Sequence, residues 1–313
     1  MNKKIAVWLL LCGIWGSTWL FIKIGLQSLP PISFAGLRFS ASALILWVIA
    51  WVQNRPLPVG RKHWEPIIWS GILGFAINYS LIFWGEQYIS SGLAAVLQAM
   101  IPVFGLFIAH YFLETERITP SRLAGVFTGV VGVSLIFANQ ISLSGSKPIL
   151  GSVALVISAF VVACSNVIIK AKGRQVDPIV ITAAQMTIGS LPLLLVGFKL
   201  EGSPLSFNWS ARSLGALAYL VLIGGVIAFA AYYWLVRHME VTQTMLVSLV
   251  TPIVAVMLGI LVLGEELSWR TAVGAILIIG GVASVLAQKL ILKAFGGREE
   301  EDEAFPANMN GNG

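Results

Sequence analysis

The chain has 313 residues, of which 57% are hydrophobic and only 11% are charged, with a formal net charge of +6. A soluble domain carries roughly 25% charged residues, so this composition excludes a water-soluble fold of this size. The positive charge is not gathered into a basic stripe, so nucleic acid is not expected as a partner, and the lipid bilayer is the expected solvent.

Ten apolar stretches are long enough to cross a bilayer as helices, which takes about 20 mostly apolar residues. In chain order they are residues 5–27, 32–53, 65–86, 91–113, 120–138, 149–170, 178–198, 213–236, 243–263 and 270–291. The first runs through Leu26 without a small-residue cleavage site, so it is predicted to be a spanning helix and not a cleaved leader. The predicted fold class is therefore an all-α integral membrane protein with ten transmembrane helices.

The Lys and Arg residues predict the orientation of these helices. If the N-terminus is cytoplasmic, 14 of the 20 basic residues fall on the cytoplasmic side, five fall on the opposite side, and Arg38 lies within a span. Positive residues favour the cytoplasmic side, so we expect a multi-pass protein of the cell inner (plasma) membrane with both termini inside. Residues 296–313 are acidic and rich in Asn and Gly, and they are predicted to form a disordered cytoplasmic tail.

The two halves of the chain resemble each other. Gly74, Trp84 and Pro102 match Gly224, Trp234 and Pro252 at a constant offset of 150 residues. Because each half has five predicted helices, an odd number, the second half must enter the membrane from the opposite face. Inverted repeats of this kind are typical of secondary transporters, which bind their substrate between the halves near the bilayer midplane.

Motifs in both halves resemble those of the EamA family of the drug/metabolite transporter superfamily. The first half has Ile14-Trp15-Gly16-Ser17-Thr18-Trp19 with Lys23, then Leu37-Arg38-Phe39 and Ile101-Pro102-Val103, and the second half has Thr251-Pro252 and Leu263-Gly264-Glu265. The resemblance covers residues from about 5 to 290. It implies two five-helix repeats, at residues 1–140 and 146–292, and export of small metabolites or drugs as the usual activity.

Polar and aromatic residues at mid-depth are the candidates for a substrate cavity, because polar groups in a bilayer core usually face a protein interior or a water-filled space. Their spacing places several of them together on single helical faces. The candidate cavity residues are Trp15, Thr18, Trp19, Asn78, Tyr79, Gln98, Ser165, Asn166, Tyr232, Tyr233 and Ser248. The alternative is that the polar groups only join neighbouring helices and that the aromatic rings pack or anchor at the membrane interface.

Two prolines and one pair of opposite charges are candidates for a mechanical role. Pro102 and Pro252 each remove a backbone hydrogen bond at the equivalent place in the two halves, which predicts a hinge or a kink beside the cavity. Arg38 and Glu86 are predicted to lie near the outer ends of their helices and to form a pair. The pair is either an outer gate, a site for a substrate carboxylate or a structural tie.

Small residues mark the last helix of each half. Gly125 and Gly129 lie in the stretch 120–138, and Gly274, Gly280, Gly281 and Ser284 lie in the stretch 270–291. Because small residues let helices approach closely, we expect these two helices to pack together as a scaffold, with a dimer interface as the alternative. The oligomer is therefore expected to be a monomer or a homodimer.

The favoured function is a secondary transporter that exports small organic metabolites such as amino acids or drugs. The alternatives are a membrane-embedded enzyme and a non-transporting scaffold or sensor. The sequence has no cluster of His, Cys, Asp or Glu at membrane depth and no nucleotide-binding loop, so neither a metal nor a cofactor is expected and the chain is not expected to be an enzyme. The substrate, the driving ion and the direction of net flux do not follow from the sequence.

Overall fold

The computed structural model describes residues 3–112, 120–143, 146–172, 176–238 and 247–296, and within these ranges the secondary structure is helical. The first half comprises α1 (Lys3–Leu26), α2 (Pro31–Val52), α3 (Arg61–Gly71), η1 (Ile72–Ile77), α4 (Asn78–Gly85), α5 (Ser91–Gln98), α6 (Ile101–Phe112) and α7 (Pro120–Leu143). The second half comprises α8 (Ser146–Lys172), α9 (Pro178–Glu201), η2 (Pro204–Ser206), α10 (Ala211–Val221), η3 (Leu222–Ile227), α11 (Ala228–His238), α13 (Val247–Leu263) and α14 (Trp269–Gly296). The predicted all-helical fold is confirmed for these residues.

Seven of the described helical segments are long and apolar enough to span a membrane. They are Lys3–Leu26, Pro31–Val52, Arg61–Gly85, Ser91–Phe112, Ser146–Lys172, Pro178–Glu201 and Ala211–Tyr232. Leu123–Ala138, Val250–Leu263 and Trp269–Ser284 are shorter apolar segments. The chain is therefore a multi-pass membrane protein, and the count of ten spans stays a prediction. The predicted tail lies outside the described residues, apart from Gly296 at the end of α14.

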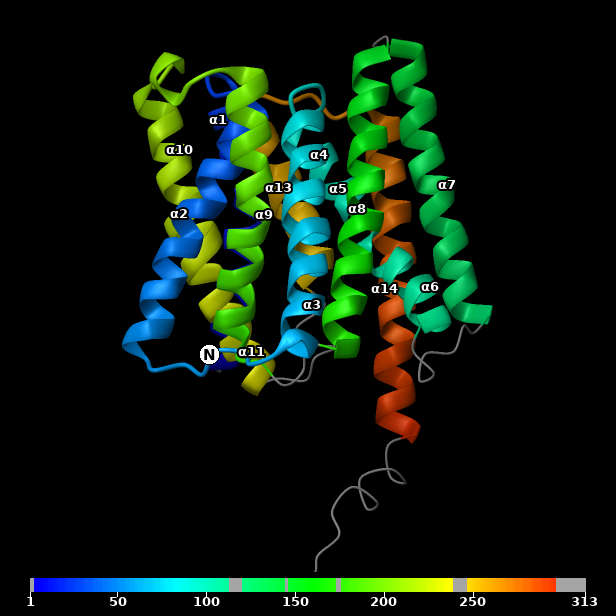
Figure 1. Cartoon of the computed structure of the whole chain (residues 1–313). Helices are drawn as coiled ribbons and strands as arrows, with labels where there is room; N and C mark the ends of the chain where they lie inside the picture. Colours follow the sequence, from blue (N-terminus) through cyan, green and yellow to red (C-terminus); the bar gives the residue numbers. More distant parts are fainter. Residues whose placement is uncertain (1–2, 113–119, 144–145, 173–175, 239–246, 297–313) are drawn as a thin grey trace, which may run out of the picture.

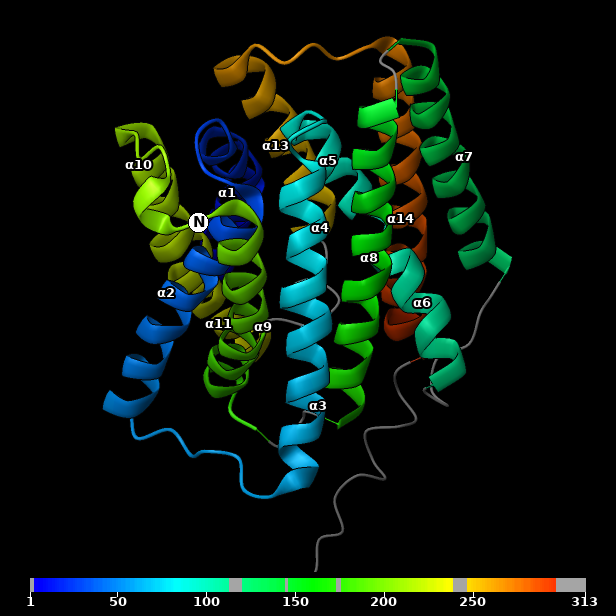
Figure 2. The same cartoon turned by 45° about the horizontal axis from the view of Figure 1, so that its top comes forward.

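The helices stand side by side and run alternately up and down (Figure 1). We call the end of the bundle where α1 begins the N-terminal end, and the opposite end the far end. The last residues of α14 lie towards the N-terminal end, as does the start of α9 (Figure 1). The starts of α2, α8 and α14 lie at the far end, where α5 also begins (Figures 1 and 2).

Packing contacts between the helices form a matched pattern. In the second half α8 packs against α3, α4 and α6, and in the first half α1 packs against α10, α11 and α13. In addition α2 packs along α9, and α7 packs along α14. The helices α1 and α8 therefore meet the opposite half through counterpart helices.

Two π-helical turns interrupt equivalent helices. The turn η1, residues Ile72–Ile77, joins α3 to α4, and the turn η3, residues Leu222–Ile227, joins α10 to α11. The offset between them is 150 residues, the same as between Gly74 and Gly224. A π-turn inserts a residue into the helical hydrogen-bond ladder and is frequent at functional sites.

The glycine-rich helices pack against each other, as predicted. A Cβ atom added to Gly281 of α14 would overlap the carbonyl oxygen of Gly125 in α7, and one added to Gly274 would lie 2.8 Å from the carbonyl oxygen of Gly132. The backbones of α7 and α14 are therefore in direct contact at these glycines. Gly280 takes no part in this contact, because a Cβ there would meet no atom within 4 Å.

Candidate functional site

Three buried polar side chains form a hydrogen-bonded chain between α4, α5 and α8. Ser158 donates its hydroxyl hydrogen to Oδ1 of Asn78 at 2.7 Å, and Gln98 donates from Nε2 to the Ser158 hydroxyl at 2.5 Å. Gln98 also donates to the carbonyl oxygen of Leu155 at 3.2 Å. Ser158 is 0% exposed, Asn78 2% and Gln98 7%, so all three face protein and not lipid.

The π-turn positions Asn78 for this contact. Asn78 is the first residue after η1, and its Nδ2 donates back to the carbonyl oxygen of Gly74 at 3.1 Å. This bond uses one of the two N–H donors of the amide and fixes its orientation, and Oδ1 accepts from Ser158. The predicted residues Asn78 and Gln98 are thus brought together, but through Ser158, which the sequence analysis did not select.

A second polar group lies next to the first along α8 and joins it to α3 and α9. Ser165 donates to the carbonyl oxygen of Ser70 at 2.9 Å, and Gln185 donates from Nε2 to the Ser70 hydroxyl at 2.7 Å. Ser158 and Ser165 are seven residues apart, two helical turns, and therefore lie on the same face of α8. This spacing is the sequence signal that identifies Ser158 together with the predicted Ser165.

Aromatic rings surround the predicted residues of α1. The indole ring of Trp15 lies 5.5 Å from the ring of Tyr232 and 6.0 Å from that of Phe229, both on α11. Trp19 packs against the main hydrophobic core. The Thr18 hydroxyl donates to the carbonyl oxygen of Trp15 at 2.7 Å, so it is satisfied within its own helix.

The remaining predicted residues are placed as follows. Tyr79 lies among the aromatic rings of the core, with its ring centroid 4.2 Å from that of Phe39. Asn166 is exposed, on a different face of α8 from the buried Ser165. Tyr233 and Ser248 lie in α11 and α13, but their side chains fall outside the described part of the chain.

The two equivalent prolines behave differently. Pro102 follows an interruption in which Ala99 and Met100 separate α5 from α6, so the predicted helix 91–113 is broken and not only kinked. Pro252 lies within the continuous helix α13. The hinge role therefore stays a prediction for both, with a preformed break only at Pro102.

Arg38 and Glu86 are both buried at the far end of the bundle, but the predicted pair is not formed. The Arg38 guanidinium lies over the rings of Phe39, Tyr79 and Phe83, at 4.8, 5.6 and 5.9 Å from their centroids. Neither Nε or Nη1 of Arg38 nor either carboxylate oxygen of Glu86 has a hydrogen-bond partner among the described residues. The guanidinium is attracted to the aromatic rings, and it makes no ion pair with the Glu86 carboxylate.

Two carboxylates at the far end bind the starts of helices in the other half. Glu265, after α13, accepts from the backbone N–H and the hydroxyl of Ser91 at 2.7 and 2.9 Å, at the start of α5. Glu201, at the end of α9, accepts from the backbone N–H groups of Ile32 and Ser33 at 2.9 and 2.7 Å, at the start of α2. A helix N-terminus has unsatisfied N–H groups and a positive dipole end, so carboxylates are stabilised there.

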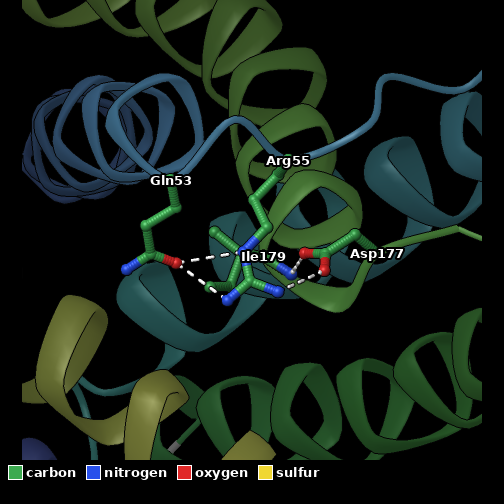
Figure 3. A network of polar contacts seen from close by, with 4 residues as sticks. All are labelled: Gln53, Arg55, Asp177 and Ile179. Atoms are coloured by element: carbon green, nitrogen blue, oxygen red, sulfur yellow. Dashed lines mark hydrogen bonds and ion pairs between the residues drawn. The ribbon is translucent and has the colours of Figure 1, made fainter.

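A third polar contact joins the halves at the N-terminal end (Figure 3). Nη1 of Arg55, after α2, lies 3.1 Å from Oδ2 of Asp177, and the other nitrogens of Arg55 donate to Gln53. Asp177 also accepts from the backbone N–H of Ile179 and so caps α9. Polar contacts therefore bridge the two halves at both ends of the bundle.

Comparison with known proteins identifies the family. The model of the EamA-like transporter family matches this chain twice, over residues 3–138 and 149–287. The uncharacterized inner membrane transporter YedA of Escherichia coli is 30% identical over 82% of this chain and 81% of its own length. Protein PagO of Salmonella typhimurium is 29% identical over 88% and 90%, and the uncharacterized transporter YoaV of Bacillus subtilis is 26% identical over 86% and 91%.

A solved crystal structure has the same fold. It superimposes with a TM-score of 0.62 over 93% of this chain and 99% of its own, at 18% identity. The family match covers most of both halves, including the motifs that carry the resemblance. This chain therefore belongs to the EamA-like transporter family.

Proposed function

We propose that this membrane transporter is a secondary carrier that exports small organic metabolites, such as amino acids or drugs, by alternating access. The observation that supports this most directly is the hydrogen-bonded chain of Asn78, Ser158 and Gln98. It places polar groups from both halves together in the protein interior, where a carrier of this kind binds its substrate.

The proposed architecture is ten transmembrane helices in two inverted five-helix repeats. The matched packing of α1 and α8 on the opposite half supports it, as do the equivalent π-turns η1 and η3. Two halves related in this way have alternative arrangements of similar energy, because exchanging their conformations exchanges which side of the membrane is open. The three shorter apolar segments complete the set of ten spans in this proposal.

The proposed topology places both termini in the cytoplasm, so that the far end of the bundle faces outward. The contacts of Glu265 and Glu201 then close the outer side, and the pair of Arg55 with Asp177 joins the halves on the cytoplasmic side. Alternating access requires the outer contacts and the inner contacts to separate in turn.

The proposed substrates are neutral or amphipathic solutes. The rings of Trp15, Phe229 and Tyr232 offer apolar surface between α1 and α11, and the polar chain between α4, α5 and α8 offers amide and hydroxyl groups. Pockets that combine apolar walls with a few directed polar groups suit small organic molecules.

The test is a transport assay with the purified protein in liposomes. We expect saturable, protein-dependent flux of at least one member of a panel of radiolabelled neutral amino acids and amphipathic drugs, measured with and without a proton gradient. Saturable flux of no member of this panel would contradict the proposal.

Two serine variants test whether the polar chain of Asn78, Ser158 and Gln98 takes part in transport. We expect Ser158→Ala to lower the flux roughly tenfold, because removing the bridging hydroxyl takes away the donor to Oδ1 of Asn78 and one of the two acceptors of Gln98 Nε2 in a buried site. Ser134→Ala is the matched control, since Ser134 is exposed on α7 and bonds only within its own helix. Equal flux in both variants would remove the polar chain from the transport mechanism.

A further inference from the structure

Glu86 has a buried side-chain carboxylate that makes no hydrogen bond to the described residues around it. It follows α4 at the far end of the bundle and is 0% exposed. Within the described part of the chain, neither of its carboxylate oxygens has a hydrogen-bond partner. At the same end of the bundle, Glu201 accepts two hydrogen bonds from backbone N–H groups, and Glu265 accepts from both the backbone N–H and the hydroxyl of Ser91.

The charged groups around Glu86 come from several elements. Lys23 of α1, Arg38 of α2 and Glu265 after α13 all interact electrostatically with its carboxylate, and the phenol of Tyr79 in α4 lies beside Arg38. None of them is close enough to form an ion pair with it: the salt bridge found among the described residues joins Arg55 to Asp177. Glu86 thus lies near opposite charges without being in contact with one.

Lys23 is held by other acceptors. Its ammonium nitrogen donates to the backbone carbonyl oxygens of Glu86 and Ile89, both at 2.6 Å, and lies 3.5 Å from that of Gln87. These three bonds use the three N–H donors of an ammonium group. Lys23 therefore fixes the backbone of the segment between α4 and α5 while the Glu86 side chain remains unpaired.

An ionised carboxylate in this environment would be expensive. Burying a charge away from water without hydrogen bonds or a contacting counter-ion carries a penalty of several kcal/mol, and protonation removes it. Ionisable residues inside transmembrane bundles commonly serve as proton relays for this reason. The geometry around Glu86 thus favours the neutral carboxylic acid in the arrangement seen here.

The same segment lies where the halves must part if the outer side opens. Glu265 holds the start of α5 from the second half, and Lys23 holds the residues just before α5 from α1. Separation of these contacts would admit water to Glu86 and free the ammonium of Lys23 to approach it. Both changes favour the ionised carboxylate.

We propose that Glu86 is a proton-binding site of the carrier, protonated while the outer ends of the helices are closed and deprotonated when they separate, so that transport is coupled to proton movement. The coupling rests on the proposed transport function, whereas the proton-binding site itself does not. By linkage, protons and the outward-open arrangement then oppose each other.

The proton site is tested without any substrate by infrared spectroscopy of the purified protein, in which the spectrum of each variant is subtracted from that of the wild type. The wild type is expected to show the carbonyl band of a protonated carboxyl group at neutral pH. Glu86→Gln should remove this band, and Glu65→Gln, which changes an exposed glutamate at the N-terminal end, should retain it. Glutamine resembles the protonated acid in shape and charge, so the Glu86→Gln protein is expected to fold. A wild-type spectrum without the band overturns the proposal even if that variant does not fold.

The coupling is tested in liposomes that contain a pH-sensitive dye, with a solute from the panel that the wild type carries. Glu86→Gln should still exchange labelled for unlabelled solute but should move no protons with it. Proton movement equal to that of the wild type overturns the coupling. If the panel yields no carried solute, the proposed function fails, and the infrared result alone decides whether Glu86 binds a proton.

Discussion

Glu265 and Ser91 join the two halves of the protein: the carboxylate that follows α13 accepts hydrogen bonds from both the backbone N–H and the hydroxyl of the residue that begins α5. The backbone N–H of Gly92 lies 3.3 Å from the same carboxylate. Gly259 leaves room for this arrangement, because a Cβ there would overlap the carboxylate. A motif that the sequence connects only with family resemblance, Leu263-Gly264-Glu265, therefore caps a helix of the other half.

Replacing Glu265 with Gln should lower the thermal unfolding temperature in detergent, with a loss of about 1–2 kcal/mol, because a charged acceptor at a helix N-terminus is exchanged for a neutral one. Glu266→Gln is the matched control, since Glu266 is the adjacent residue and is exposed. Equal unfolding temperatures for the two variants would show that the contact of Glu265 with α5 does not stabilise the fold.

Gly281→Ala should destabilise the seam between α7 and α14 by about 1–3 kcal/mol, because the added methyl group would overlap the backbone of α7 at Gly125 and Gly129. Gly280→Ala provides the control at the neighbouring position, where a Cβ meets no atom within 4 Å. The measurement is the fraction of protein that remains monodisperse after heating in detergent. A loss that is as large for Gly280→Ala would contradict the glycine contact as the cause.

The membrane class and the helical segments could be predicted from the sequence because hydrophobic length alone specifies a spanning helix. The packing of α7 on α14 was also predictable, since small residues are the requirement for close approach of helices. Gly132 was nevertheless missed, although its backbone contacts that of Gly274. One sequence does not reveal which of several glycines faces the partner helix.

The contacts between residues of the candidate site are harder to predict from the sequence than the helices are. Asn78 and Gln98 are predicted because they are polar at mid-depth, whereas their link, Ser158, shows in the sequence only through its seven-residue spacing from Ser165, since the rotation of α8 about its axis decides which of its serines face the interior. The expected pair of Arg38 and Glu86 failed for a related reason. Opposite charges at similar depth suggest a pair, but the aromatic rings of Phe39, Tyr79 and Phe83 bind the guanidinium instead.

Substitutions at the contact of Arg55 with Asp177 should separate the contribution of the ion pair from that of the helix cap. Arg55→Gln should change the free energy of unfolding by less than about 1 kcal/mol, because the Arg55 side chain is 29% exposed and a partly solvated ion pair contributes little. Asp177→Ala should have the larger effect, about 1 kcal/mol more, since it also removes the cap on the Ile179 N–H at the start of α9. Chemical or thermal unfolding of the two variants and of the double variant measures both components. A larger loss for Arg55→Gln than for Asp177→Ala would contradict this division.

Replacing Arg38 should affect stability and transport differently: the unfolding temperature should stay equal or rise, whereas transport should be lost. Its Nε and Nη1 are buried without hydrogen-bond partners among the described residues, so Arg38→Met, which keeps a long apolar side chain between the same rings, should leave the unfolding temperature equal or raise it. If the guanidinium finds its partner in the outward-open arrangement, the same variant should lose transport, because it no longer stabilises that arrangement. The two measurements are unfolding temperature in detergent and solute flux in liposomes, with Arg38→Lys as the variant that keeps the charge but loses the planar guanidinium group. Full transport by Arg38→Met would remove Arg38 from the mechanism, and a strong loss of stability would instead identify it as a structural tie between α2 and the aromatic residues of α4.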